Sequence, residues 1–214
     1  NCGIKVSPFF SISNYDELVE GFDKLNSYGI LKTRRLGYDG KGQFAAESID
    51  EVFQAWKKLN SVPCIFEKKV NFEKEISSII TRTITGETAE FDISENNHKN
   101  GILITSKVPA SISLNSVTKA KEISKLIAEK LDYVGTLAVE MFLCNDDEIL
   151  VNEIAPRVHN TGHWTIDACY TDQFEQHIRA ICGLKLGESF RHSDATMTNL
   201  IGQNIDQIRP ILSN

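Results

Sequence analysis

The 214-residue sequence lacks three features that would place it in a special class of protein. No apolar run approaches the roughly 18 residues that a membrane-spanning helix needs. Acidic residues outnumber basic ones, 29 to 23, so the net charge of −6 offers no general attraction for nucleic acid or anionic lipid. No repeat or low-complexity tract interrupts the chain. These absences indicate an ordinary globular protein, long enough for one large domain or two small ones.

Cysteine pairs and an initiator methionine are also missing. The five cysteines stand at scattered positions and none belongs to a Cys-x-x-Cys pair. That pattern favours reduced thiols in a cytoplasmic protein over a disulfide framework or a zinc site. The chain starts Asn1-Cys2-Gly3, with neither Met nor a signal-peptide pattern, and we expect it to be the interior of a longer protein.

Helical and extended patterns alternate along the chain and predict an α+β or α/β architecture. Apolar residues at helical spacing predict helices over roughly 15–27, 49–60 and 117–131, the third capped by Asn115 or Ser116. A fourth helix is expected to start at Thr171 and to carry Phe174, Ile178 and Ile181. Strands are expected at 30–32, 43–46, 64–70, 76–85, 87–93, 102–105, 136–143 and 148–154, and near 197–201. The segment 95–101 is predicted to be a polar loop.

The most unusual stretch is 152–164, which holds two histidines, an arginine and a tryptophan close together. An apolar run at 149–151 reads as a strand that delivers Asn152 and Glu153 at its end. Pro156 then stops regular pairing, because it has no N–H to donate. This density of polar and ionisable side chains favours a binding site for an anion on a rigid support. The alternative is a well hydrogen-bonded connection over the core.

Two carboxylates, Glu140 and Glu153, flank a turn at 145–147 almost symmetrically. In a hairpin closed there, Glu140 lies opposite residue 152 or 153, so both carboxylates can stand on one face of the sheet. Like charges in that position are destabilising, and a divalent cation between them would remove the penalty. Mg²⁺ prefers one or two carboxylates plus phosphate oxygens, and Asn152 could complete the set. The alternative is a pair of solvated residues whose side chains diverge.

The segment 35–43 is rich in glycine. Gly37, Gly40 and Gly42 permit positive φ and close backbone approach, and successive N–H groups there can cradle phosphate oxygens. Lys32 lies just upstream and Lys41 lies within the segment. The pattern is not the G-x-x-x-x-G-K-[ST] loop, and a mobile hairpin tip is the alternative.

Two weaker signals accompany these. A strand end with Glu67 and Val70 can bind a purine through backbone groups and a ribose through the carboxylate, although a solvated charge run is the alternative. His98 lies in the predicted polar loop, where a single histidine is more often structural. The combination of a glycine-rich phosphate cover, upstream lysines and a two-carboxylate metal site predicts a nucleoside triphosphate enzyme. Its triphosphate would lie between a small β-rich lobe and a larger lobe that holds the metal.

Three segments in order resemble the ATP-grasp enzymes, and among them the N5-carboxyaminoimidazole ribonucleotide synthetase family. They are Gly-Tyr-Asp-Gly-Lys-Gly-Gln at 37–43, Glu-Asn-Asn-His-Lys-Asn-Gly-Ile-Leu at 95–103 and Asn-Glu-Ile-Ala-Pro-Arg-Val-His-Asn-Thr-Gly-His-Trp at 152–164. Other ATP-grasp ligases share Lys32 and the Glu140/Glu153 pattern, whereas the His-Asn-Thr-Gly-His-Trp run points to this family. The resemblance covers nearly all of 1–200. It implies two α+β lobes, 1–70 and 71–187, with nucleotide between them, and the start of a truncated C-terminal β domain at 188–214.

The resemblance implies a reaction in de novo purine biosynthesis. ATP, bicarbonate and 5-aminoimidazole ribonucleotide would give ADP, phosphate and N5-carboxyaminoimidazole ribonucleotide through carboxyphosphate. It also implies ATP and Mg²⁺ as cofactors, small-molecule partners with no nucleic acid or membrane, a cytoplasmic location and a homodimer in the full-length protein. Family members carry an N-terminal α/β domain and a longer C-terminal β domain, so we expect this polypeptide alone to catalyse poorly. The alternatives are another ATP-grasp ligase, such as a formate-dependent ribonucleotide transformylase or a biotin-carboxylase relative, and a nucleotide-binding fragment without turnover.

The resemblance assigns roles to individual residues. Within the nucleotide-binding set, Lys32 and 37–43 would meet the phosphates, 67–70 the adenine and Glu75 the ribose. Glu140 and Glu153 would ligate Mg²⁺. The whole nucleotide-binding set is Lys32, Gly37, Tyr38, Asp39, Gly40, Lys41, Gly42, Gln43, Glu67, Lys68, Lys69, Val70, Glu75, His98, Asn152 and Glu153.

The resemblance also implies a catalytic set of Asp39, Arg157 and His159. Asp39, with Tyr38 near it, would orient or deprotonate the amine of the substrate. Arg157 and His159 would meet carboxyphosphate and the ribonucleotide.

Overall fold

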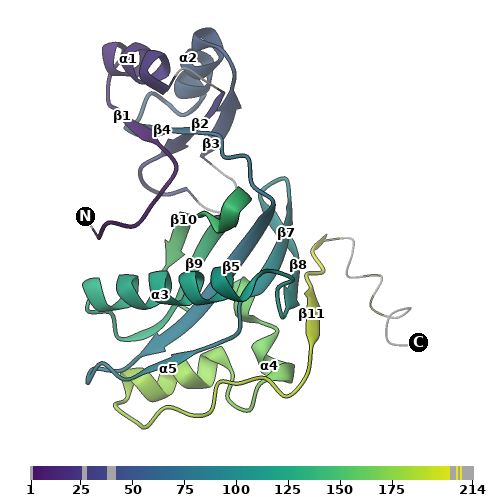
Figure 1. Cartoon of the computed structure of the whole chain (residues 1–214). Helices are drawn as coiled ribbons and strands as arrows, with labels where there is room; N and C mark the ends of the chain where they lie inside the picture. Colours follow the sequence, from purple (N-terminus) through teal and green to yellow (C-terminus); the bar gives the residue numbers. More distant parts are fainter. Residues whose placement is uncertain (1, 26–27, 38–41, 203–205, 207, 209–214) are drawn as a thin grey trace.

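The computed structural model describes residues 2–25, 28–37, 42–202, 206 and 208. Two antiparallel sheets, each covered by helices, lie one above the other (Figure 1). The predicted α+β fold is therefore confirmed. Within the described part of the chain, no helix combines the length and the apolar character that crossing a membrane requires.

The small sheet has the strand order β1-β4-β2-β3, and α1 and α2 pack on one of its faces (Figure 1). Buried side chains such as Leu31 and Phe66 form the core between the helices and the sheet. Lys32 pairs with Gln43 across β2 and β3, which joins the two ends of the glycine-rich segment. The elements are β1 (Phe9–Ile12), α1 (Tyr15–Leu25), β2 (Gly29–Thr33), β3 (Gln43–Ala46), α2 (Ile49–Lys58) and β4 (Cys64–Lys68).

The large sheet has the order β10-β9-β5-β7-β8-β11, with β6 beside β5. Helix α3 covers one face, and α4 and α5 cover the other (Figure 1). Ile80 packs on the α3 side and its neighbour Ile79 on the opposite side, so β5 is buried on both faces, as the adjacent isoleucines predict. The elements are β5 (Lys74–Arg82), β6 (Thr88–Glu90), β7 (Ser94–Lys99), β8 (Ile102–Val108), α3 (Leu114–Lys130), β9 (Gly135–Leu143), the 3₁₀ turn η1 (Asn145–Asp147), β10 (Ile149–Ala155), the 3₁₀ turn η2 (Asn160–Gly162), α4 (Thr165–Ala168), α5 (Gln173–Ile181) and β11 (Ala195–Thr198).

The predicted polar loop at 95–101 is wrong, because most of it forms β7. Asn96 is buried, and its Nδ2 donates to Ser77 Oγ at 3.0 Å while its Oδ1 accepts from Ser106 Oγ at 2.9 Å. A strand whose inward side chains hydrogen-bond to one another has no apolar alternation for the sequence to reveal. The polar composition of 95–101 therefore gives no indication that most of it forms a central strand of the large sheet.

Smaller differences concern the ends of two elements. The strand expected at 87–93 is reduced to the short β6. The cap of α3 is Ser113, whose Oγ accepts from the N–H of Ser116 at 3.0 Å, and not Asn115 or Ser116. β11, inside the segment predicted to begin a separate β domain, pairs with β8 of the large sheet.

Helix α5 has the reverse of the usual burial pattern. Its apolar residues Phe174, Ile178 and Ile181 are exposed, whereas Gln173 and Gln176 are fully buried. The polar side of this helix therefore faces the protein, and the glutamines must find hydrogen-bond partners there.

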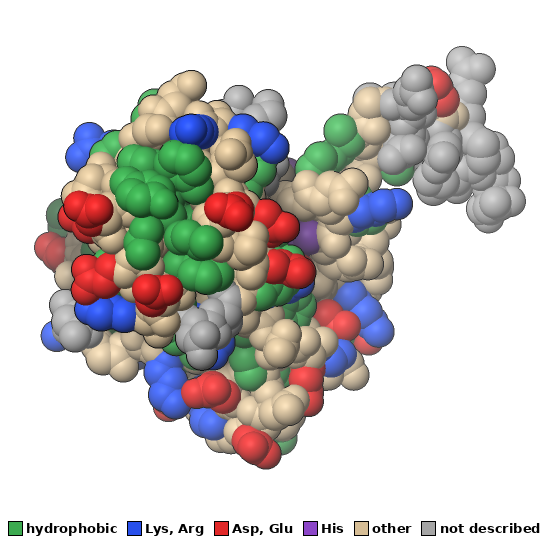
Figure 2. Space-filling view, turned by 90° about the horizontal axis from the view of Figure 1, so that it is seen from above, with side chains coloured by type: hydrophobic (Ala, Val, Ile, Leu, Met, Phe, Trp, Pro, Cys, Tyr) green, Lys and Arg blue, Asp and Glu red, His purple; other side chains and the backbone are tan. Residues whose placement is uncertain are grey.

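Apolar side chains also gather on the outer surface at the end of the molecule where α1 and α2 lie, with charged side chains around them (Figure 2). Tyr15 on α1 is half exposed, and its ring meets Phe53 of α2 edge-on with centroids 5.1 Å apart. This surface lies away from the ionisable residues that the sequence singled out, most of which face the space between the two sheets.

Candidate nucleotide and metal site

A cleft of about 1020 Å³ lies between the small and the large sheet. Glu140 and His159 line it from the large sheet and the turn that follows β10. Tyr38, Asp39, Gly40 and Lys41 lie outside the described residues. The members of the predicted nucleotide-binding set that line the cleft are Lys32, Gly37, Gly42, Gln43, Glu67, Lys68, Lys69, Val70, Glu75, His98, Asn152 and Glu153.

The hairpin of β9 and β10 places Glu140 opposite Glu153, as the turn at 145–147 predicts. The register shifts between Val151 and Glu153, so Asn152 is the extra residue of a bulge. Ligand atoms of Glu140, Glu153 and His159 all lie within 4.8 Å of one another. Because β10 ends at Ala155, the predicted stop at Pro156 is also observed.

The surroundings of Glu140 disfavour its ionised form. Burial, and then the charge of Glu153, raise the pKa of Glu140 to about 7, although His98 and Arg157 act in the opposite direction. A largely buried carboxylate that faces a second one is the donor set that a hard divalent cation fits. Residues Glu140 and Glu153 therefore suit Mg²⁺, as the sequence predicts.

The metal-free protein is expected to lose stability as the pH rises from 4.5 towards 7. In that window Glu140 keeps its proton in the folded chain but loses it in the unfolded chain, so the folded state binds more protons and a rise in pH favours unfolding. A hydrogen bond to Glu75 raises the pKa of His98 above 6.5, and this contribution is also lost on going to higher pH. Thermal unfolding at about pH 5 and about pH 8, with and without Mg²⁺, measures the effect.

We expect Mg²⁺ to raise the melting temperature more at the higher pH, where it no longer competes with the proton on Glu140. The Glu140→Gln variant is the control, since it should show a smaller pH dependence without metal. Equal pH dependence in the variant and the original protein would contradict this assignment.

His98 and Glu75 form a close pair on the wall of the cleft. His98 Nδ1 lies 2.5 Å from Glu75 Oε2, which joins β7 to β5. Glu140 and Glu153 add to the negative potential that stabilises the imidazolium of His98, and its pKa is raised. His98, which the sequence alone does not distinguish from a structural histidine, therefore lies among the ionisable groups of the cleft.

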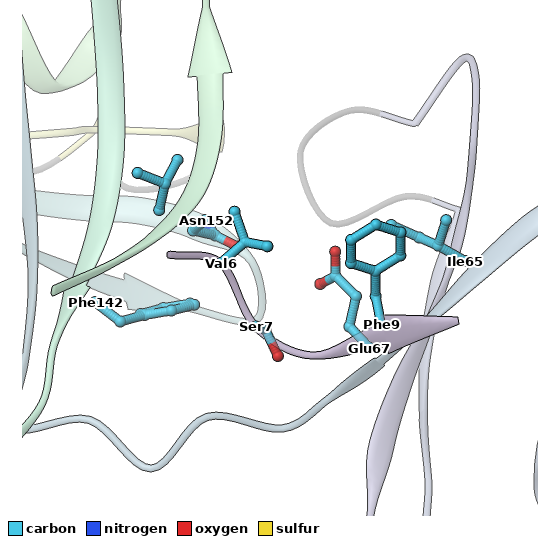
Figure 3. A pocket seen from close by; sticks show the side chains of 8 residues that line it. Val6, Ser7, Phe9, Ile65, Glu67, Phe142 and Asn152 are labelled. Carbon is cyan, nitrogen blue, oxygen red and sulfur yellow. The ribbon is translucent and has the colours of Figure 1, made fainter. Parts of the chain in front are cut away.

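Lys32 connects the two sheets across the cleft. Its Nζ lies 2.6 Å from Glu67 Oε2 on β4 and donates to Asn152 Oδ1 on β10 at 3.4 Å. Figure 3 shows Glu67 and Asn152 on opposite sides of a smaller cavity, about 120 Å³, that adjoins the cleft and that Ser7 and Phe142 also line. The ammonium group of Lys32, on the small sheet, thus lies within hydrogen-bond distance of Asn152, the residue before Glu153.

The N-terminal segment ties the sheets together at the same place. The N–H of Val151 donates to the carbonyl of Lys5 at 3.0 Å, and Ser7 Oγ donates to the carbonyl of Lys68 at 2.5 Å. Residues 5–7 together therefore bridge the strand that bears Asn152 and the strand end that bears Glu67, and Figure 3 shows this segment passing between the two. This crossing fixes one side of the cleft.

Arg157 is not among the described residues that line the cleft. Its guanidinium donates to the carbonyl of Val158 at 2.9 Å and is exposed, although its charge acts on Glu140. His159 is nearly buried, with Nδ1 2.9 Å from Thr161 Oγ1 and 3.7 Å from Glu140 Oε1. The structure thus brings His159, but not the Arg157 side chain, beside the carboxylate pair.

Sequence reasoning missed the apolar part of the cleft wall. The rings of Phe72 and Phe142 stack with centroids 4.7 Å apart, and both residues line the cleft. Phe142 lies two residues beyond Glu140 on β9, so the period of two along a strand would have placed it on the same face. Asn160 and Asn199 also line the cleft without having been predicted.

The model of the ATP-grasp domain matches residues 1–174, and the chain belongs to this family. Within it, the chain is similar to N5-carboxyaminoimidazole ribonucleotide synthases. The synthase of Brucella melitensis is 48% identical over 212 residues, which are 98% of this chain and 59% of that relative.

Solved structures agree. A synthetase of this name in complex with ADP has a TM-score of 0.94 and 45% identity, and the match covers 99% of this chain and 56% of the other. The synthase of Aspergillus clavatus in complex with ADP and 5-aminoimidazole ribonucleotide has a TM-score of 0.91 and 28% identity, with 99% and 57% covered. The chain therefore spans a little over half the length of the relatives it matches, and the predicted ATP-grasp fold is confirmed.

Proposed function

We propose that the complete protein is an ATP-dependent carbon–nitrogen ligase that carboxylates 5-aminoimidazole ribonucleotide with bicarbonate. Its products would be N5-carboxyaminoimidazole ribonucleotide, ADP and phosphate. The observation that carries the proposal is the single cleft that joins Lys32 and Glu67 of the small sheet to Glu140, Glu153 and His159. The names of the similar proteins, and the ADP and 5-aminoimidazole ribonucleotide in one related structure, support it.

The reaction has two steps. An oxygen of bicarbonate attacks the γ-phosphorus of ATP, the bond to the bridging oxygen breaks, and ADP leaves carboxyphosphate behind. The exocyclic amine of the ribonucleotide then attacks the carboxyl carbon of carboxyphosphate, or CO₂ released from carboxyphosphate. Phosphate departs and the amine loses a proton. Phosphoryl transfer of this kind needs positioning and charge neutralisation more than covalent help.

We assign the charge neutralisation to residues on both sides of the cleft. Lys32 would meet the phosphates together with the glycine-rich segment. Glu140 and Glu153 would hold Mg²⁺, which when bound neutralises charge on the phosphates. Adenine would lie along 67–70, with the ribose at Glu75 and His98 nearby.

The acceptor would meet the other end of the site. His159 lies beside Glu140 and would contact carboxyphosphate or the ribonucleotide, with Arg157 reaching the same ligands after a side-chain movement. Asp39 and Tyr38, for which we propose a role at the substrate amine, lie outside the described residues. The assignment of the acceptor side therefore depends chiefly on His159.

The proposal includes a cytoplasmic location and a homodimer for the complete protein. The five cysteines are free thiols, two of them buried, which fits a reducing compartment. The homodimer rests on the resemblance alone, and light scattering of the complete protein at several concentrations tests it. A monomer at all concentrations would remove that part of the proposal.

The test of the reaction uses the complete reading frame that encodes these residues. With Mg·ATP, bicarbonate and 5-aminoimidazole ribonucleotide, we expect one ADP for each N5-carboxyaminoimidazole ribonucleotide detected by mass spectrometry. Formate with glycinamide ribonucleotide should give no product. Stimulation by that pair instead would indicate another ATP-grasp ligase, and saturable Mg·ATP binding without any product would indicate a nucleotide-binding protein without turnover.

A further inference from the structure

Two glutamines on the buried side of α5 each hold the backbone of a distant residue. Gln173 Nε2 donates to the carbonyl of His159 at 2.7 Å, and its Oε1 accepts from the N–H of His159 at 3.0 Å. Gln176 binds the backbone of Gly187 in the same way. Its Nε2 donates to the carbonyl of Gly187 at 2.6 Å, and its Oε1 accepts from the N–H of Gly187 at 3.1 Å. Each side-chain amide thus satisfies both backbone polar groups of one residue, which explains why α5 buries glutamines.

Gln173 is itself held in place. Its side chain is fully buried, and its N–H donates to Thr165 Oγ1 at 3.1 Å. Its carbonyl accepts from Thr136 Oγ1 at 3.1 Å, and Thr136 pairs in turn with Thr81 Oγ1 at 2.8 Å. Because Thr136 lies on β9, the strand that also bears Glu140, Gln173 links the backbone of His159 to that strand.

The chain around His159 is shaped to fit this amide. A Cβ on Gly162 would lie 2.5 Å from Gln173 Oε1, so only glycine leaves room for the amide at that position. Thr161 sets the ring, with its Oγ1 2.9 Å from His159 Nδ1. The glycine of the His-Asn-Thr-Gly-His-Trp run therefore has a packing reason, which is contact with Gln173.

We propose that Gln173 is a positioning residue for His159. By holding both backbone polar groups of His159 relative to β9, it keeps the imidazole beside Glu140, where Nδ1 lies 3.7 Å from Oε1. Gln173 is not among the described residues that line the cleft, so it acts only through His159. The kinetic consequence rests on the proposed function, whereas the placement of His159 does not.

The paired glutamines supply a matched experiment. Gln173→Met and Gln176→Met each remove two hydrogen bonds from a buried amide with little change in volume, so each should lower the melting temperature. In the complete protein, Gln173→Met should lower kcat/KM for 5-aminoimidazole ribonucleotide or bicarbonate at least about tenfold, because small misplacements of a contacting group are costly. The KM for ATP should stay nearly unchanged in this variant. Gln176→Met should keep both kcat/KM values and the KM for ATP near those of the original protein.

A second variant and a second readout keep the test decisive. Gln173→Glu keeps an acceptor for the N–H of His159 but loses the donor to the carbonyl of His159, so we expect a kinetic loss between those of the original protein and Gln173→Met. This variant replaces Gln173→Met in the test if Gln173→Met fails to fold. Histidine side-chain NMR, with the His159 signals assigned by their loss in His159→Asn, should show those signals shifted by Gln173→Met and not by Gln176→Met.

The NMR readout separates the two proposals. If the unaltered protein forms no product but the His159 signals move as expected, the proposed function fails and the positioning role stands. If Gln173→Met and Gln176→Met change the His159 signals and the kinetic constants equally, Gln173 is only structural and the inference is overturned.

Discussion

Replacing Glu140 by Gln is expected to lower the carboxylation rate at least about 100-fold, because the variant loses a carboxylate that we propose holds Mg²⁺ beside the transferred phosphoryl group. The same change should leave the metal-free protein as stable as before or more stable. Glu140 faces Glu153 directly and burial raises its pKa to about 7, so the ionised side chain is unfavourable without metal. If Glu140 and Glu153 are a metal ligand pair, the two carboxylates should repel each other without Mg²⁺ and be required for activity with it.

Two measurements check this prediction. Product formation at increasing Mg²⁺ gives the rate and the metal dependence, and thermal unfolding without metal gives the stability. Glu148→Gln is the control, since Glu148 lies on the same hairpin but pairs with Lys5 at 2.7 Å, and it is not among the described residues that line the cleft. Unchanged Mg²⁺ dependence in Glu140→Gln would remove the metal assignment.

Replacing Lys32 by Met is expected to raise the KM for ATP by about 10- to 100-fold, the cost of one charge-assisted phosphate contact. The variant also leaves Glu67, now 2.6 Å from Lys32 Nζ, without its partner beside the proposed triphosphate site. The KM for bicarbonate should change less, because Lys32 lies on the small sheet and the carboxylate pair on the large one.

Lys74→Met is the matched control for Lys32. Lys74 Nζ lies 2.7 Å from Glu95 Oε2, and the two side chains are 30% exposed, close to the 24% and 18% of Lys32 and Glu67. Neither Lys74 nor Glu95 is among the described residues of the cleft wall. Steady-state kinetics at saturating bicarbonate compares the two variants, and an equal effect on the KM for ATP would indicate a general loss of charge and not a phosphate contact.

The carboxylate pair illustrates what a sequence can predict. The turn at 145–147 and the period of two along strands are local properties, and they suffice to bring Glu140 opposite 152 or 153. The choice between the two depends on the bulge at Asn152, which no local pattern specifies. The hairpin and its two strands could thus be predicted, but not the register to one residue, which decides whether the two carboxylates share a face.

Buried polar residues limited how much of the remaining fold and site could be predicted from the sequence. Asn96 and Gln173 are both buried, and each is stabilised by hydrogen bonds to residues far away in the sequence. Hydropathy patterns treat such residues as exposed, so β7 was predicted as a loop and α5 attracted notice for Phe174 and Ile178 instead of its glutamines. Residues that support the site from behind are therefore the ones that sequence patterns leave out.

The most direct test of the account follows oxygen from bicarbonate. The complete protein is incubated with Mg·ATP, 5-aminoimidazole ribonucleotide and ¹⁸O-labelled bicarbonate, and the released phosphate is analysed by mass spectrometry. If bicarbonate attacks the γ-phosphorus, each phosphate should carry one ¹⁸O atom from bicarbonate, and ADP should carry none. Phosphate without label, formed at the same rate with or without bicarbonate, would show that water is the acceptor and would contradict the proposed reaction.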